Sequence, residues 1–388
     1  MSASAASPPR SISTTPDALT VEWSDGTRHR FPSLWLRDNV PEHRDPHSGQ
    51  RLVDIADLPG NPRIRAAAVD GGRLRIEWQG EERASSLELG WLVRQARRMR
   101  SLRPQLTPRH WLEGASLDAT RDFARARLAD ARRDPALRLQ WMSRLLEDGV
   151  AFLSHAGHGE GSLLEAMRLL GQVAETNYGQ AFDVRSVPQP ENLAYSDLGL
   201  GLHTDNPYRE PVPGFQALHA LVCSPDGGES LFADGFALAE HLRASRPADF
   251  ALLSEVAVPF LYRSANAELY AERPLIQVSA RGAVSAVHYN SRSIAPLDPA
   301  CGRLVEYYAA YRRFAGLLRE PRFQLRFKLA DAEIVVFDNQ RILHGRTAFS
   351  SARHARHLRG CYLTRDSVYS TAALLERSLE SGAPHDGR

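Results

Sequence analysis

The feature that most constrains the fold of this chain is the pair of potential metal ligands His203 and Asp205, which His344 joins much later in the sequence. If residues 203–205 form an extended strand, His203 and Asp205 face the same side and can reach one ion, while Thr204 faces away. Together with His344 they form a group of two histidines and one carboxylate, the ligand set of non-haem iron sites that leave positions free for a co-substrate and O2. The fold must therefore bring two distant segments into contact.

A second feature is Arg356, which follows His344 after a short stretch. A strand after His344 could direct this guanidinium at a carboxylate of a metal-bound 2-oxo acid, because arginine binds carboxylates through two parallel hydrogen bonds. The same three ligands could also serve a zinc hydrolase, in which water fills the fourth position. Arg356 favours the iron site over this alternative. A cupin-like binding protein without activity is a further alternative, but it would be expected to have a disrupted triad.

The composition excludes several classes of protein. The formal net charge of +2 gives no reason to expect a nucleic-acid or membrane-surface partner. The three cysteines, Cys223, Cys301 and Cys361, are far apart and form no C-x-x-C pair, which is typical of a reducing cytoplasm. No apolar run approaches the roughly 18 residues that a membrane-spanning helix needs. We therefore expect a cytoplasmic protein, and 388 residues with 43% hydrophobic content suffice for two domains.

The N-terminal part predicts a small β-rich domain over residues 17–105. Residues 1–16 are rich in Ser, Ala and Pro and lack an apolar signal core, so we expect a disordered tail. Residues 19–23 and 28–31 flank an Asp-Gly turn, which indicates a β-hairpin, and residues 74–78 repeat the pattern. A short helix is expected at residues 91–102, and the prolines between residues 102 and 114 indicate the domain boundary.

Residues 115–388 predict a second domain of short strands and helices. Helical periodicity covers residues 134–148, 162–173, 236–244 and 304–318. Short strands are expected at residues 149–153, 215–222, 258–263, 275–279, 283–289, 333–337 and 360–365. Many short strands, with two ligands in one and the third beyond a later one, indicate a double-sheet jelly roll, or double-stranded β-helix. A TIM barrel would need regular strand–helix alternation, which is absent. The predicted fold class is mainly β with flanking helices.

Longer segments around the triad carry a family resemblance that a lone H-x-D could not support. They are residues 203–207 (His-Thr-Asp-Asn-Pro), 227–230 (Gly-Gly-Glu-Ser) and 337–346 (Phe-Asp-Asn-Gln-Arg-Ile-Leu-His-Gly-Arg). Taken jointly, they resemble the Fe(II)/2-oxoglutarate dioxygenases of the taurine-dioxygenase-like superfamily. Residues 192–195 (Asn-Leu-Ala-Tyr), 178–179 and 356–358 narrow the resemblance to the γ-butyrobetaine hydroxylase family, which includes trimethyllysine hydroxylase. The resemblance covers nearly the whole chain.

Membership of this family would imply a role for each residue of the triad. His203, Asp205 and His344 would hold Fe(II), and Arg356 would bind the distal carboxylate of the co-substrate 2-oxoglutarate. With O2, such an enzyme hydroxylates a C–H bond of a small trimethylammonium compound. The resemblance also implies a homodimer, since the family's N-terminal domain commonly takes part in dimer formation. An additional interaction role of residues 19–103 stays open.

The resemblance further implies an aromatic cage for the trimethylammonium group, formed by Tyr178, Phe182, Tyr195 and Tyr362. A quaternary ammonium has no proton to donate, so its recognition depends on desolvation and on aromatic faces. Cation–π attraction contributes about 0.5–2 kcal/mol for each well-placed ring. Phe182 stands where relatives often carry Trp, which should widen the cage and weaken it modestly.

The anionic end of the substrate is expected to meet Asn192, Asn206, Asn290, Ser291 and Arg292. Ser291 lies where carnitine-forming relatives tend to have a second Asn, and Arg292 follows directly. A guanidinium suits a doubly charged phosphonate better than a carboxylate. We therefore predict hydroxylation of γ-butyrobetaine to carnitine, with 2-(trimethylammonio)ethylphosphonate or another betaine as the alternative substrate.

The sequence departs from the family at a structural zinc site. Relatives often carry a cysteine cluster after the Trp-Leu-Arg-Asp-Asn segment at residues 35–39. Residues 40–45 hold His43 but no cysteine, so a sulfur-rich tetrahedral site cannot form there. We expect His43 and His47 to be ordinary loop histidines, and we predict no structural zinc.

Overall fold

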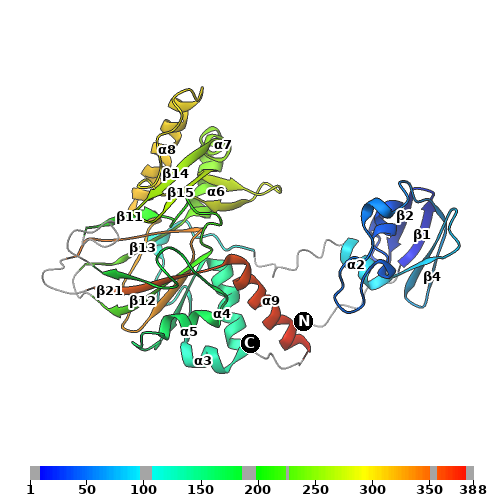
Figure 1. Cartoon of the computed structure of the whole chain (residues 1–388), viewed down its shortest axis with the longest axis horizontal. Helices are drawn as coiled ribbons and strands as arrows, with labels where there is room; N and C mark the ends of the chain where they lie inside the picture. The colour runs from blue at the N-terminus through cyan, green and yellow to red at the C-terminus, as the bar shows by residue number, and fades with distance from the viewer. Residues whose placement is uncertain (1–8, 97–106, 186–197, 224–226, 350–355, 382–388) are drawn as a thin grey trace. The chain divides into compact units, whose positions relative to one another are not determined.

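The structure, a computed structural model, describes residues 9–96, 107–185, 198–223, 227–349 and 356–381. The chain divides into two compact units, Met1–Ser101 and Leu102–Arg388 (Figure 1). The smaller unit has its own hydrophobic core, and the larger unit has three. Among the described residues, no helix is both long and apolar enough to cross a bilayer.

The described residues of the smaller unit form two three-stranded antiparallel sheets and two α-helices. The first sheet consists of β1 (Pro9–Thr15), β2 (Ala18–Trp23) and β3 (Arg28–Pro32), and the second of β4 (Ile64–Asp70), β5 (Arg73–Trp78) and β6 (Ser85–Glu88). The helices are α1 (Ser33–Asp38) and α2 (Leu89–Ala96), with short 3₁₀ turns η1 (Pro41–His43) and η2 (Ile55–Asp57). Trp23 and Trp78, at the ends of β2 and β5, are buried in one core with Leu19 and Ile76. The predicted hairpin of β2 and β3 is confirmed.

The prediction of a disordered tail over residues 1–16 is wrong for its second half. Residues Pro9–Thr15 form β1, which pairs antiparallel with β2 from Thr15 opposite Ala18 to Pro9 opposite Trp23. Ile12 supplies the apolar contact, since it packs against the core of this unit. The prediction rested on the overall Ser, Ala and Pro content and did not consider residues 11–15, Ser-Ile-Ser-Thr-Thr. The β-branched residues in this run favour a strand at the edge of a sheet. Residues 1–8 lie outside the described residues.

The larger unit is built on two sheets. The seven-stranded sheet has the order β10-β21-β12-β19-β8-β7, with β9 paired to β21, and the four-stranded sheet has the order β11-β20-β13-β18. The strands of the first are β7 (Ala124–Arg127), β8 (Val150–Ser154), β9 (Val173–Ala174), β10 (Phe182–Arg185), β12 (Phe215–Val222), β19 (Ile334–Asp338) and β21 (His357–Leu363). The strands of the second are β11 (Leu200–His203), β13 (Ser230–Asp234), β18 (Leu325–Phe327) and β20 (Ile342–Arg346).

The central strand β19 shows why these sheets form layers. All five of its residues are buried, and successive side chains enter different cores. Val335 and Phe337 pack with Phe232 and Phe327 of the four-stranded sheet, so the two sheets face each other across this core. Ile334 and Val336 pack instead against helices on the other side of the large sheet. A continuous apolar run, rather than an alternating one, is what a strand covered on both faces requires.

Helices cover the outer face of the large sheet. They are α3 (Leu128–Arg133), α4 (Pro135–Asp148), α5 (Ser162–Arg168) and α9 (Arg365–Ser381), which lie together in Figure 1. The Asp134 carboxylate caps α4 by accepting hydrogen bonds from the N–H groups of Ala136 and Leu137. Gly149 ends α4 in the left-handed conformation at φ 79°, which glycine adopts without a steric penalty. The predicted helix at residues 162–173 is shorter in the structure, since α5 ends at Arg168.

The remaining elements form a third layer beside the four-stranded sheet. They are α6 (Gly235–Ser245), α7 (Pro247–Glu255), β14 (Ala257–Arg263), β15 (Glu268–Pro274), β16 (Ile276–Val278), β17 (Val284–Val287) and α8 (Leu304–Arg319), with 3₁₀ turns η3 (Gly114–Ser116) and η5 (Pro321–Phe323). All of these elements except η3 contribute to one core. The predicted strands at residues 149–153, 215–222, 258–263 and 333–337 are confirmed as β8, β12, β14 and β19, whereas β13, β15, β18, β20 and α7 were not predicted.

A buried ion pair fixes the strands of the four-stranded sheet at their ends. The Arg341 guanidinium donates hydrogen bonds to both carboxylate oxygens of Asp234, at 3.1 and 2.7 Å. It also donates to the backbone carbonyls of Glu147 and Arg109, both at 2.7 Å. Asp234 ends β13 and caps α6, while Arg341 precedes β20. The pair therefore joins the two strands at the point where β20 begins.

We expect Arg341→Met to destabilise the protein by about 3–5 kcal/mol, because removing one partner of a buried pair leaves an uncompensated charge. Urea unfolding of the variant measures this loss. Arg341 and Asp234 side chains are only 2% and 0% exposed. The matched control is Glu240→Gln, which breaks the ion pair with Arg243, whose side chains are 32% and 33% exposed. That control should cost at most about 1 kcal/mol, and an equal loss in both variants would contradict the prediction.

Candidate metal centre and substrate cavity

The two histidines of the predicted triad come from adjacent strands. β11 pairs antiparallel with β20, and His203 lies directly opposite His344 in this pairing. Their ring centroids are 4.4 Å apart. β20 also pairs with β13 on its other side, which places Phe232 opposite His344. His344 is thus held in a central strand and packs against Phe232 and Phe337.

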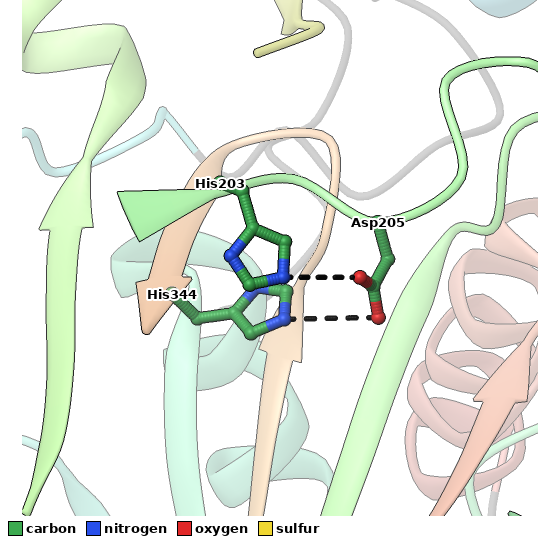
Figure 2. Close-up of side chains that lie close together, drawn as sticks. All are labelled: His203, Asp205 and His344. Carbon is green, nitrogen blue, oxygen red and sulfur yellow. Dashed lines mark ion pairs between the residues drawn. The ribbon is translucent and has the colours of Figure 1, made fainter. Parts of the chain in front are cut away.

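Asp205 does not lie in an extended strand, which corrects the local structure expected from the sequence. β11 ends at His203, and the next residues are held by other contacts. The Thr204 N–H donates to the Tyr289 carbonyl at 2.7 Å, and the Asp205 N–H donates to Oδ1 of Asn339 at 2.7 Å. Asn206 then adopts φ 53°, in the left-handed region. Even so, the Asp205 carboxylate faces both imidazoles (Figure 2).

The three side chains form a compact group of potential ligand atoms. Nε2 of His203 lies 3.3 Å from Oδ1 of Asp205, and Nε2 of His344 lies 3.7 Å from Oδ2. One ligand atom from each residue lies within 4.8 Å of the others. A search of the described residues for clusters of at least three His, Cys, Asp or Glu side chains that could hold a metal ion identifies these three residues. Two imidazoles and a carboxylate suit Fe(II).

The protonation states also fit a metal ligand set. Nδ1 of His203 lies 2.9 Å from the Gly201 carbonyl, which can only accept, so Nδ1 carries the proton and Nε2 presents its lone pair. Burial, together with the nearby His344, lowers the pKa of His203 to about 4. Burial alone would raise the pKa of Asp205, but the two histidines outweigh it and lower this pKa well below its usual value. At neutral pH the group is therefore a neutral His203 beside an ionised Asp205.

Tyr362 binds the carboxylate of the triad directly. Its hydroxyl donates a hydrogen bond to Oδ2 of Asp205 at 2.8 Å. Burial and the charge of Asp205 raise the pKa of Tyr362 well above its usual value, so the phenol stays a donor. Tyr362 had been predicted as part of an aromatic cage. The structure gives it a second contact, to the proposed metal ligand.

A cavity of about 400 Å³ opens beside the triad. Three kinds of residue line it. They are the triad with Phe232, the aromatic rings of Phe182, Tyr208 and Tyr262, here called the aromatic wall, and several arginines and amides. The lining residues are Phe182, Val184, Leu200, His203, Asp205, Asn206, Tyr208, Gln216, Leu218, Ser230, Phe232, Leu261, Tyr262, Arg263, Asn290, Arg292, Ser293, His344, Gly345, Arg346, Arg356 and Leu358.

Three of the four residues predicted for the cage lie at the aromatic wall or in ring contact with it. The ring centroid of Phe182 lies 6.3 Å from that of Tyr178 and 5.1 Å from that of Tyr362. Phe182 lines the cavity itself, whereas Tyr178 and Tyr362 are not among its lining residues. Tyr195 lies outside the described residues.

Sequence reasoning missed two tyrosines of this wall. Tyr208 and Tyr262 stack with ring centroids 5.1 Å apart, and both line the cavity. Tyr178 meets Tyr262 edge-on at 6.2 Å. Tyr208 follows Asp205 closely in the His-Thr-Asp-Asn-Pro-Tyr segment, so its position was a usable signal. Tyr262 comes from β14, and nothing in the sequence connects that strand with the triad.

Amide and guanidinium groups lie near the triad on the same cavity. Asn206 is buried, its Oδ1 accepts a hydrogen bond from the Tyr208 hydroxyl at 2.6 Å, and its Nδ2 has no partner among the described residues. Asn290 donates from Nδ2 to the Thr204 carbonyl at 3.2 Å. Arg292 is exposed to solvent and lines the cavity. The protein around its guanidinium removes part of the hydration of the charge and so lowers its pKa, and the negative charge of Asp205 partly offsets this effect.

The prediction that Ser291 contacts the substrate is not supported by its position. Ser291 is exposed and is absent from the described lining of the cavity, while Ser293 is buried and lines it. The reason is a tight turn after Asn290, in which the Ser293 N–H and hydroxyl both donate to the Asn290 carbonyl. This turn directs Ser293 inward. Asn192, predicted for the same role, lies outside the described residues.

Two further arginines of the cavity lining are buried and lie close to each other. Arg356, directly before β21, and Arg346, at the end of β20, are 8% and 5% exposed. Both guanidiniums lie over the Phe349 ring, at 5.8 and 5.6 Å from its centroid. Burial and the charge of Arg346 lower the pKa of Arg356 to about 10, so it remains protonated at neutral pH. A dianionic ligand would relieve the repulsion between these charges.

In the loop for which we predict no zinc, His43 forms a hydrogen bond with Arg37. Nη1 of Arg37 lies 2.8 Å from Nε2 of His43, so His43 accepts from a cation. Arg37 also makes a bidentate contact with Glu81. The absence of structural zinc stays a prediction.

Comparison with known families and proteins gives consistent matches along the chain. Residues 115–362 match the family described as taurine catabolism dioxygenase TauD, TfdA family. Residues 11–92 match the family described as gamma-butyrobetaine hydroxylase-like, N-terminal. A gamma-butyrobetaine dioxygenase of Pseudomonas sp. (strain AK-1) is 34% identical over 378 residues, covering 96% of this chain and 97% of the relative.

More distant relatives share the same extent. The human gamma-butyrobetaine dioxygenase is 27% identical over 377 residues, which cover 94% of this chain and 96% of the relative. A trimethyllysine dioxygenase of Meyerozyma guilliermondii is 26% identical, with 92% and 94% covered.

We expect Asp205→Asn to weaken divalent metal binding by more than the roughly 10–100-fold typical of residues outside the ligand shell, because it removes the charged ligand. Anaerobic titration with Fe(II) or Co(II) measures the affinity. Asp183→Asn is the matched control, since Asp183 also contacts a histidine, His357, at 2.9 Å but forms no group of three ligands with the described residues. Equal affinities of the two variants would refute the assignment of the metal centre.

Proposed function

Because the chain belongs to the taurine catabolism dioxygenase TauD, TfdA family, we propose that it uses Fe(II), 2-oxoglutarate and O2 to hydroxylate γ-butyrobetaine to carnitine. The observation that carries the proposal is the cavity that joins the His203–Asp205–His344 group to an aromatic wall and to buried arginines. The two facing sheets are consistent with the double-stranded β-helix predicted from the sequence. A homodimer and a cytoplasmic location remain part of the proposal.

The proposed binding of iron and co-substrate assigns a task to each residue around the triad. His203, Asp205 and His344 would hold Fe(II), and Arg356 would bind the distal carboxylate of 2-oxoglutarate, beside Arg346. The bound iron and 2-oxoglutarate supply the oxidising chemistry, while the protein positions the substrate and excludes water. The Tyr362 hydroxyl keeps the Asp205 carboxylate turned toward the two imidazoles.

The trimethylammonium group of the substrate would lie against Phe182, Tyr208 and Tyr262. These rings offer faces that attract a cation by about 0.5–2 kcal/mol each. The hydroxyls of the tyrosines are not needed for this contact, and the Tyr208 hydroxyl is already bonded to Asn206. The stacked rings of Tyr208 and Tyr262 would add to the cage predicted around Phe182.

The anionic end of the substrate would be bound by Arg292 and by the free donors of Asn206. A buried amide without a partner costs free energy unless a ligand satisfies it. Because the aromatic wall and Arg292 lie on the same cavity, they would hold the two ends of a zwitterion and determine which C–H bond faces the metal.

Arg292 also favours a second candidate substrate, 2-(trimethylammonio)ethylphosphonate. A phosphonate carries up to two negative charges and offers three oxygens to a guanidinium, so it gains more from Arg292 than a carboxylate does. Both candidates share the trimethylammonium group. They differ in the anionic group and in the length of the chain between the charges.

Turnover by the anaerobically iron-loaded enzyme tests the proposal. γ-Butyrobetaine, trimethyllysine and 2-(trimethylammonio)ethylphosphonate are supplied separately with 2-oxoglutarate and O2, and succinate and product mass are followed. A gain of one oxygen on γ-butyrobetaine supports carnitine formation, and a gain on the phosphonate alone transfers the proposal to that substrate. Metal-dependent turnover without O2 would instead indicate a hydrolase.

We expect Arg356→Gln to raise the KM for 2-oxoglutarate about 10–150-fold, since a hydrogen bond to a charged group contributes about 1.5–3 kcal/mol. Steady-state kinetics with varied 2-oxoglutarate measures this change. Arg359→Gln, which lies three residues later within β21 and is partly exposed, is the control and should leave this KM unchanged. A similar KM for both variants would contradict the role of Arg356.

We expect Arg292→Gln to raise the KM for the zwitterionic substrate, with the KM for 2-oxoglutarate unchanged, because Arg292 and Arg356 would bind different anions. The rise should be about tenfold or more, as for the loss of a charge-assisted hydrogen bond. Arg303→Gln is the control, because Arg303 pairs with Glu255 through exposed side chains and is not among the lining residues of the cavity. If the KM for 2-oxoglutarate rises instead, Arg292 does not bind the anionic end of the substrate.

A further inference from the structure

Asn339 is a buried polar residue that forms hydrogen bonds to Asp205 of the triad but is not itself one of the potential metal ligands. It lies in the turn between β19 and β20 and is 0% exposed. It is not among the residues that line the cavity. A buried amide is tolerated only when its donors and acceptor are satisfied, so its partners indicate its function.

The Asn339 side chain binds the backbone of Asp205 on both sides. Its Oδ1 accepts a hydrogen bond from the Asp205 N–H at 2.7 Å, and its Nδ2 donates to the Asp205 carbonyl at 3.1 Å. The second N–H of the amide points to the Pro213 carbonyl at 3.2 Å. The amide thus gives Asp205 the donor and acceptor that a neighbouring strand would supply, at the place where β11 has already ended.

The same turn leads directly into the strand that carries His344. β20 begins at Ile342, and His344 is paired there with Phe232 and His203. Asn339 therefore connects the backbone of Asp205 to the segment that places His344. The carboxylate itself is oriented by Tyr362, but that bond can act only if the Asp205 backbone is fixed.

We propose that Asn339 is a positioning residue, which holds the backbone of Asp205 so that its carboxylate stays at ligand distance from His203 and His344. The inference rests on the proposed role of Asp205 as a metal ligand. It predicts that metal affinity depends on the side-chain amide of Asn339, although this amide touches neither the ion nor any substrate.

The turn itself has enough other contacts to persist without this amide. Gln340 donates from Nε2 to the Val212 carbonyl at 3.1 Å, and its Oε1 accepts from Arg365 at 2.8 Å. Arg365 also binds Asp338 at 3.0 Å. Loss of the Asn339 amide should consequently disturb Asp205 more than it disturbs the turn.

Asn339→Asp is the sharpest variant, because it preserves the shape and the Oδ1 acceptor but replaces Nδ2 by an oxygen that faces two carbonyls. Gln340→Glu is its matched control. It makes the same amide-to-carboxylate change at the next residue and removes a donor to the same loop, at Val212 instead of Asp205. Asn339→Ala is a second variant, which removes the clamp without adding a buried charge in case Asn339→Asp does not fold.

The experiment measures Fe(II) or Co(II) affinity by anaerobic titration, together with the thermal midpoint of the metal-free proteins. We expect about 10–100-fold weaker metal binding in Asn339→Asp, as is typical when a residue that orients a ligand is lost. Gln340→Glu should keep the wild-type affinity. Equal affinities of the Asn339 variants and the wild type, or equal losses in the Asn339 and Gln340 variants, would overturn the inference.

A second measurement separates positioning from general destabilisation. In an Asp205→Asn background the ligand is already lost, so adding Asn339→Asp should not weaken metal binding further. A further loss in the double variant would show that Asn339 acts by destabilising the fold, which overturns the inference. If the wild type binds no metal, or if Asp205→Asn leaves its affinity unchanged, the proposed metal centre itself fails.

Discussion

The antiparallel pairing of β11 with β20 is the contact on which the site depends. It places His203 opposite His344 although the two residues are far apart in the sequence. Strand pairing fixes the separation and direction of opposite side chains, so the two imidazoles meet without any local motif that joins them. The buried pair of Arg341 and Asp234, at the start of β20 and the end of β13, keeps this sheet in register.

The charged side chains around this strand pairing suit ligands that themselves carry charged groups. Burial keeps His203 neutral, and the histidines keep Asp205 ionised. Arg346 and Arg356 are buried close enough to lower the pKa of Arg356, which makes their surroundings strongly attractive to an anion. The aromatic wall around Tyr208 and Tyr262 offers a cation its best surface. A zwitterionic substrate and a dicarboxylate co-substrate match these separate regions.

Much of this arrangement was predictable from residue types, and several parts were not. The triad, Arg356, Phe182 and Arg292 were predicted, and all of them line one cavity. Strands β8, β12 and β19 were predicted because their apolar runs are long and continuous. β1 was missed because its composition resembles a tail, and its strand depends on pairing with β2. Tyr262 was missed because it reaches the cavity from β14, which no sequence pattern connects with the triad.

The sequence by itself determined which chemistry is available: two histidines and a carboxylate for a metal, arginines for anions and aromatic rings for a cation. Only the tertiary structure decided how they meet. The sequence pattern suggested that Asp205 shares a strand with His203, yet β11 ends first and Asn339 holds Asp205 in place. The physical reason is that the residue type alone determines the functional group of a side chain. Its position in space depends on hydrogen bonds and packing with segments that are distant in the sequence.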